Sequence, residues 1–247
     1  RATTIITTTA SKLLCRNPTF RILYGDQATS DCPSSDVHNI TFLNGQMSSC
    51  NAVYTKATVN GVVKTVLLTA DVCKDFIDQV STADSAYELT IRDTKYPIVR
   101  PDFNTVTGSN RIAFIEVNQN ILYGSSDCEQ TVCPYNKATM DGRVNFQHCK
   151  IYSWGKSNSD DFSANGLNQV NVALNSGGCT DTTDNIDASS TLCFKTISGQ
   201  NLLCSSDSGA PVYCPAIESN EWLLIGVAAF QENCDATSEV KVLQHPG

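Results

Sequence analysis

The sequence CSSDSGAPVYC, residues 204–214, decides how the rest of the chain is interpreted. A serine between an aspartate and a glycine, Ser208, lies in a segment bounded by two cysteines. One large class of hydrolases presents its nucleophile in this way. A serine hydroxyl is very weakly acidic, so it reacts only when a base is positioned beside it. The chain must therefore supply that base, and a group that orients it, if Ser208 is to act as a nucleophile.

The composition predicts an all-β protein. The 247 residues are 41% hydrophobic, which is enough for a substantial core in one large domain or a closely packed two-lobed one. Apolar runs are brief and rich in valine and isoleucine, and turn signals such as Asn44-Gly45, Asn60-Gly61 and Asp141-Gly142 separate them. The longest stretch without periodicity, residues 124–142, divides these runs into two similar sets. A pair of β-barrels is the simplest architecture with this pattern.

The connector, together with the family resemblance given below, divides the chain into four segments. They are a tail or propeptide-like segment (1–21), a first β-barrel (22–123), a connector (124–142) and a second β-barrel (143–247).

The cysteines and the charge indicate a secreted protein. Twelve cysteines, an even number, favour a disulfide framework made in an oxidising compartment, with any signal segment already removed. No Cys-x-x-Cys pair has a matching partner pair, so we expect no metal and no cofactor. Asn39 begins an Asn-Ile-Thr glycosylation sequon. The net charge of −8 opposes binding to nucleic acid or to anionic membranes, and we expect neither as a partner.

Five segments of the chain resemble motifs of the chymotrypsin-like (trypsin-like) serine proteases, in the family's order and over roughly Arg21 to Cys234. The family has a basic residue before Ile-Val-Gly-Gly, then Val-Val-Thr-Ala-Ala-His-Cys, Asn-Asp-Ile-Ala-Leu-Leu, Cys-x-x-x-Gly-Trp-Gly and Cys-x-Gly-Asp-Ser-Gly-Gly-Pro. The matching segments here are RILYGDQA (21–28), VLLTADVC (66–73), RPDFNTVTGSNRIAFIEV (100–117), CKIYSWGKS (149–157) and CSSDSGAPVYC (204–214). The resemblance implies two packed, six-stranded-type antiparallel β-barrels, disulfide-rich, with a short or missing C-terminal helix.

The same resemblance implies a degenerate catalytic triad. The family's general base is the histidine before the cysteine, and Val72 occupies that position. The orienting aspartate corresponds to Arg111, and the nucleophile to Ser208. Valine has no ionisable group, and arginine stays protonated at physiological pH, so neither can accept a proton. We therefore expect no enzyme activity.

No other residue is placed to serve as the base. None of the three histidines, His38, His148 and His245, falls on a motif that would bring it to Ser208, and each is expected to be an ordinary surface or turn residue. Asp71 could accept a proton, but strand alternation is expected to point it away from the direction of Val72.

The oxyanion hole and the specificity pocket depart from the family as well. Ser206 stands where the family has the glycine of the oxyanion hole, and a side chain there disfavours the backbone that aims the N–H group. Leu202 stands at the pocket floor, which makes the pocket apolar and filled. Gln231 places a long side chain on a wall that is normally glycine.

The activation switch of the family has both partners in this chain. In the family, cleavage after the basic residue frees an isoleucine amine that pairs with the aspartate before the serine. Arg21, Ile22 and Asp207 hold these positions. Cleavage is then expected to raise thermal stability, with Cys15 keeping the two pieces joined. The alternative is that Arg21 is an ordinary surface residue and that backbone N–H groups of its own loop hold Asp207.

The disulfide pairing also follows from the resemblance. The last two pairs stay open to exchange between Cys128 and Cys133. The implied pairs are Cys50–Cys73, Cys149–Cys214, Cys179–Cys193, Cys204–Cys234, Cys15–Cys133 and Cys32–Cys128.

A secreted, inactive protease homologue is the function that these positions favour. Such a protein would act by binding a protein partner, as a decoy, an inhibitor, a protease cofactor or an adaptor. One alternative is a weak serine hydrolase that uses Ser208 with an unrecognised base. The other is a structural or storage protein of the extracellular space.

Overall fold

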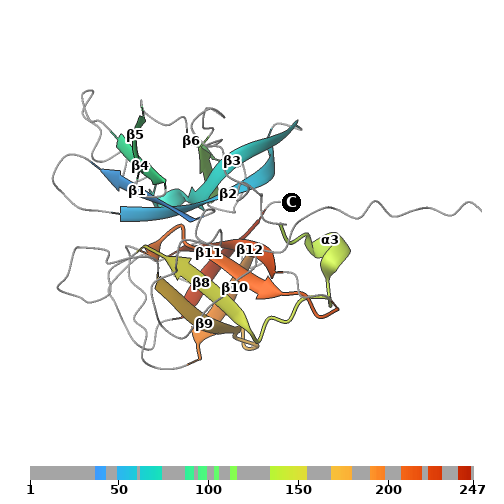
Figure 1. Ribbon diagram of the computed structural model, residues 1–247. Helices are drawn as coiled ribbons and strands as arrows, with labels where there is room; N and C mark the ends of the chain where they lie inside the picture. Colours follow the sequence, from blue (N-terminus) through green and yellow to red (C-terminus); the bar gives the residue numbers. More distant parts are fainter. Residues whose placement is uncertain are drawn as a thin grey trace, which may run out of the picture.

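Thirteen strands within the described residues form two sheets, one above the other in Figure 1. The computed structural model describes residues 37–42, 49–59, 62–73, 87–91, 94–98, 103–105, 112–115, 134–154, 168–179, 190–197, 207–218, 222–229 and 239–245. The strands are β1 (Val37–Phe42), β2 (Ser49–Val59), β3 (Val62–Ala70), β4 (Tyr87–Ile91), β5 (Thr94–Ile98), β6 (Phe103–Thr105), β7 (Ile112–Ile115), β8 (Cys149–Ser153), β9 (Asn168–Leu174), β10 (Thr191–Thr196), β11 (Pro211–Pro215), β12 (Trp222–Ala229) and β13 (Val240–Gln244).

The first sheet has the strand order β5-β4-β1-β2-β3-β7-β6, with antiparallel pairs throughout. Its longest hairpin joins β2 to β3, where Val59 pairs with Val62 and two residues connect the strands. The sequence there, Asn60-Gly61, is a common one for two-residue loops between antiparallel strands. The last five residues of β3, 66–70, are all buried, on both faces of the strand. One reason is that β3 also contacts β12 of the second sheet.

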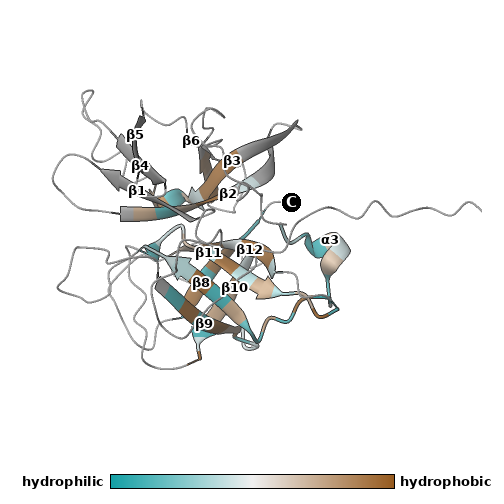
Figure 2. Ribbon diagram, in the orientation of Figure 1, coloured by the Kyte–Doolittle hydropathy of each residue, from teal (hydrophilic) through white to brown (hydrophobic). Residues whose placement is uncertain are grey.

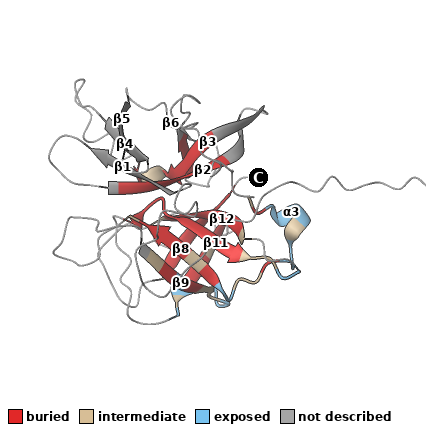
Figure 3. Ribbon diagram, in the orientation of Figure 1, coloured by how far each residue is buried: buried red, intermediate tan, exposed pale blue. Residues whose placement is uncertain are grey.

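The second sheet is a closed barrel in the order β10-β13-β12-β11-β8-β9. Closure leaves no free edge, because β13 pairs with both β10 and β12. The brown strands in Figure 2 and the red strands in Figure 3 show that apolar, buried residues fill this barrel. The fully buried members of its core include Val172, Phe194, Val212, Ile225 and Val242.

The all-β, chymotrypsin-like architecture expected from the sequence is confirmed, with one difference in detail. The barrel has six strands, but the first sheet has seven. After Cys234, the described residues 239–245 contain strand β13 and no helix. A strand forms there because β10 and β12 offer backbone partners that close the barrel.

A short helix lies in the predicted connector. Helix α3 (Lys137–Met140) begins where the side chain of Asn136 accepts a hydrogen bond from the N–H of Ala138, at 2.9 Å. The four segment boundaries themselves stay a prediction. Within the described ranges, no helix is long and apolar enough to cross a bilayer.

Candidate functional site

Ser208 lies in a buried turn that precedes β11. Residues 207–210 are all buried, and the exposed fraction of Ser208 is 0%. The N–H of Ala210 donates to the carbonyl of Asp207 at 3.0 Å, which closes the turn. The N–H of Gly209 donates to the carbonyl of Ala228 in β12 at 2.8 Å. The turn is therefore tied to the barrel on one side.

Asn51 of β2 ties the same turn to the first sheet. Its backbone N–H donates to the carbonyl of Ser208 at 2.8 Å. Its side-chain Oδ1 accepts from the N–H of Trp154, the residue after β8, at 2.8 Å. Its own carbonyl accepts from the hydroxyl of Thr69 at 2.7 Å. Asn51 is 1% exposed, so it bridges both sheets inside the protein.

Gly209 is required by two features of this turn. Its φ of +80° lies in the left-handed region, which side-chain-bearing residues adopt at a cost. A Cβ atom at this position would also overlap the carbonyl oxygen of Asn51 and the hydroxyl of Thr69. Only glycine lets the turn approach β2 this closely.

Asp207 finds a partner in the second barrel. Asp207 and Ser153, the last residue of β8, are each 4% exposed. The Ser153 hydroxyl donates to Oδ1 of Asp207 at 2.5 Å. A hydrogen bond to an ionised carboxylate is stronger than one between neutral groups, and burial strengthens it further. The aspartate before Ser208 is therefore held by a side chain from another strand as well as by its own turn.

Val72 lies in a helical turn, Asp71–Cys73, directly after β3. Cys73 forms a disulfide with Cys50, the neighbour of Asn51, so a short covalent path links Val72 to the residue that holds Ser208. We expected Asp71 and Val72 to point in opposite directions, as alternate residues of a strand do. That reasoning was wrong, because the strand ends at Ala70 and both residues lie in the helical turn. Asp71 and Val72 are both half-buried.

Several of the predicted site residues lie outside the described residues. Ile112 pairs with Ala70, so the register brings the start of β7 beside the end of β3. The residues whose predicted roles stay untested for this reason are Arg111, Ser206, Leu202, Gln231, Arg21 and Ile22.

Three of the six predicted disulfides are confirmed. They are Cys50–Cys73, Cys149–Cys214 and Cys179–Cys193. The half-buried Glu239 lies beside the third disulfide, so the three side chains could in principle surround a metal ion. The two sulfurs are bonded to each other, however, and offer no thiolate ligand. The other three predicted pairs lie outside the described residues in at least one partner.

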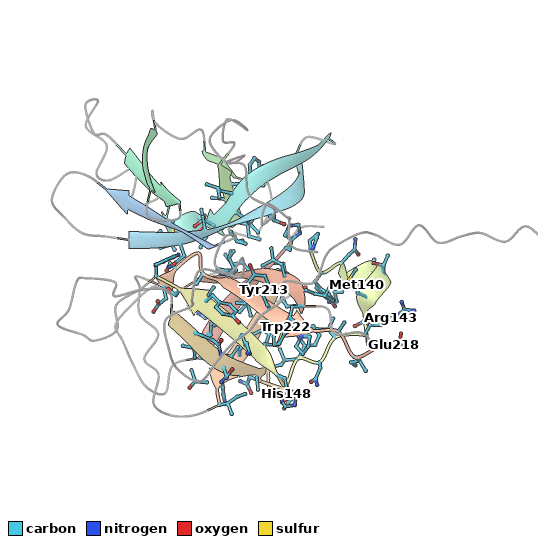
Figure 4. The ribbon with its side chains drawn as sticks, viewed as in Figure 1. Met140, Arg143, His148, Tyr213, Glu218 and Trp222 are labelled. Atoms are coloured by element: carbon cyan, nitrogen blue, oxygen red, sulfur yellow. A yellow bond between two sulfur atoms is a disulfide. The ribbon has the colours of Figure 1, made fainter. Side chains whose placement is uncertain are left out.

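Two histidines can be compared with expectation. His148 is exposed and lies at the end of the barrel far from the first sheet, as Figure 4 shows. His245 is 6% exposed, so the prediction of a surface residue was wrong for it. It is buried because its N–H donates to the carbonyl of Ile225 at 2.9 Å, which extends the pairing of β13 with β12.

Asn39 lies in the middle of β1, where it pairs with Asn51 of β2 and Thr90 of β4. The sequon is therefore in a strand with neighbours on both sides. Its glycosylation stays a prediction.

The sequence pattern did not point to Asn51, Thr69 or Ser153 as parts of this site. Ser153 carried a visible signal, because it replaces the first glycine of the family's Gly-Trp-Gly. Asn51 carried none, since its role depends on atoms brought together from three strands.

Two antiparallel sheets, one of them a closed barrel, that pack around a buried serine turn are the arrangement of the chymotrypsin-like fold. The family model described as Trypsin matches residues 45–245 of this chain, and the chain therefore belongs to the trypsin family.

Proposed function

We propose that this protein is a secreted, non-catalytic serine protease homologue that acts by binding another protein. The partner is a protease, an inhibitor or another extracellular protein. The family fold is established, but a fold supports many functions, so the argument rests on the residues of the site.

The side chain at position 72 carries the proposal. The family motif requires a histidine immediately before the cysteine that here bridges to Cys50. Valine at this position has no lone pair to accept the proton of Ser208. Loss of one triad member lowers turnover by about 10⁴–10⁶-fold in a serine protease.

The burial of Ser208 agrees with this proposal. A nucleophilic oxygen must reach about 3 Å from a substrate carbonyl carbon to react. The 0% exposure of Ser208 leaves no surface for that approach in this conformation. The retained serine is explained by packing, since a small side chain fits a turn that Gly209 and Pro211 specify.

The cysteines support the extracellular part of the proposal. Three disulfides pin β2 to the turn after β3, β8 to β11, and the end of the β9 turn to β10. Such bonds form and persist in oxidising compartments.

The first test measures esterase and peptidase turnover and the labelling of Ser208 by an organophosphonate. Trypsin serves as the positive control, and mass spectrometry locates the label. We expect no turnover and no adduct. Stoichiometric modification of Ser208 at neutral pH contradicts the proposal and favours the weak hydrolase.

Reversion of the triad provides a second test. Val72→His alone is expected to restore no activity, because on the family's arrangement the new imidazole faces Arg111. A fixed cation opposes the imidazolium that must form as the serine loses its proton. Adding Arg111→Asp should leave turnover low, because Ser206 and a filled pocket remain. Robust activity in the single revertant would show that the site is misassigned.

Affinity capture from the native extracellular fluid tests the binding role. We expect one partner that is retained at submicromolar affinity and released by unlabelled protein. Abundance in that fluid without any such partner supports the structural or storage alternative.

A further inference from the structure

The carboxylate of Asp207 has a partner that the family motif does not provide. The hydroxyl of Ser153 donates to it at 2.5 Å, and both residues are 4% exposed. The family motif has glycine at the position of Ser153, and glycine has no hydroxyl. This contact is therefore a departure of this chain and not an inherited feature.

Ser153 is held in place by the barrel. It is the last residue of β8 and pairs with Asn168 of β9. The next residue, Trp154, donates its N–H to Asn51, which in turn donates to the carbonyl of Ser208. One end of one strand thus supports the turn on two sides, through the Asp207 carboxylate and through Asn51.

A buried carboxylate is expensive to desolvate, and a protein must offset that cost with a partner. In the family's activation switch, the partner is a charged amine that becomes available only after cleavage. Here a hydroxyl from β8 hydrogen-bonds the carboxylate, and a hydroxyl, unlike the amine, does not need a cleaved chain to be present.

We propose that Ser153 replaces the freed amine of Ile22 as the internal partner of Asp207, so that the turn carrying Ser208 has the same structure before and after cleavage at Arg21. The switch is then permanently set, and the protein can bind a partner without prior proteolytic activation. This inference rests on the family membership and on the contacts above, and it is independent of whether Ser208 reacts.

The test compares intact protein with protein cut directly before Ile22. To make the cut specific, an enteropeptidase site is built by five substitutions. The predicted disulfide of Cys15 is expected to keep the two pieces joined. The substitutions are Asn17→Asp, Pro18→Asp, Thr19→Asp, Phe20→Asp and Arg21→Lys. Melting temperature and the exchange of backbone amide hydrogens in residues 207–210 are measured for both forms.

We expect cutting to change the melting temperature by less than about 1 °C and to leave amide protection in residues 207–210 unchanged. Ser153→Ala should lower the melting temperature of the intact form by about 5 °C, because the buried carboxylate loses a hydrogen bond. Ser176→Ala, on an exposed turn, is the matched control and should not change it.

Asp207→Asn keeps the proposal testable if Ser153→Ala does not fold. The amide oxygen can still accept from the Ser153 hydroxyl, but it has no negative charge with which to form an ion pair with an ammonium group. The difference in melting temperature between this variant and wild type should therefore be the same before and after cutting. A rise of several degrees in the wild type on cutting, or a difference that widens after cutting, overturns the proposal. The proposal is also overturned if the Ser153→Ala protein has the same melting temperature as the wild type.

Discussion

At the scale of single residues, the site depends on backbone atoms as much as on side chains. Asn51 uses its N–H, its carbonyl and its side-chain oxygen to join Ser208, Thr69 and Trp154. These bonds are 2.7–2.8 Å long and lie where the two sheets meet. Adding a single carbon atom at this point should therefore lower the free energy of unfolding measurably.

The glycine in the turn offers a matched comparison. Gly209 and Gly142 both have positive φ angles, of +80° and +74°, but only Gly209 faces other atoms within 4 Å of an added Cβ. Gly142→Ala should cost only the backbone strain, about 1 kcal/mol. Gly209→Ala should cost at least about 3 kcal/mol, because the overlap with Asn51 and Thr69 adds to that strain.

Chemical denaturation of both variants measures the two costs. Equal losses of unfolding free energy would contradict the close approach of Gly209 to β2. The wild type is the reference for both variants.

At the scale of elements, two of the disulfides link neighbouring segments of the barrel. Cys149–Cys214 joins β8 to β11 across 65 residues of sequence, and Cys179–Cys193 joins the turn after β9 to β10 across 14. A disulfide restricts the unfolded chain more when its loop is longer. The strand pair that carries Ser153 and the turn of Ser208 is therefore the more strongly supported one.

Removing each disulfide by a double alanine substitution tests this ranking. Loss of Cys149–Cys214 should cost about 4 kcal/mol of unfolding free energy, and loss of Cys179–Cys193 about 3 kcal/mol. Burial of both sulfurs of the first pair adds to its cost in the same direction. Urea denaturation of the two double variants gives the comparison, and the reverse order would show that chain entropy does not dominate here.

At the scale of the whole molecule, the stability depends on keeping buried tyrosines neutral. Burial raises the pKa of the Tyr152 hydroxyl well above its ordinary value of about 10. Burial, and in second place the charge of Asp141, also raises the pKa of Tyr135. A folded pKa above the unfolded one gives stability that is complete below pH 10 and is lost as pH rises through the folded pKa.

The loss of stability at alkaline pH should therefore depend on Tyr152. Above pH 10 the unfolded chain releases a proton that the folded chain retains, which lowers stability by about 1.4 kcal/mol per pH unit for this one group. Tyr152→Phe keeps the ring that contacts Tyr213 and removes the ionisable hydroxyl. Unfolding free energies measured between pH 9 and pH 12 should fall less steeply in this variant. Parallel curves for variant and wild type would contradict the role of Tyr152.

Much of the fold was predictable from the sequence, because it depends on local patterns. Short apolar runs separated by turn residues predicted the strands, and Asn60-Gly61 predicted the hairpin of β2 and β3. The family resemblance predicted Cys50–Cys73 and Cys149–Cys214. The strand β13 was not predicted, because a short run of mixed residues forms a strand only when neighbouring strands, here β10 and β12, have unpaired backbone groups to bond with it.

The sequence by itself determined which chemistry position 72 can offer, since a valine carries no ionisable group in any fold. It also determined that Gly209 follows Ser208 and that a hydroxyl stands at Ser153. Only the tertiary structure decided that this hydroxyl meets Asp207 and that Asn51 holds the carbonyl of Ser208. Ser153 and Asp207 are separated by 54 positions in the sequence, and Asn51 and Ser208 by 157. The geometry of these two contacts depends on how the two sheets pack together, which no local pattern encodes.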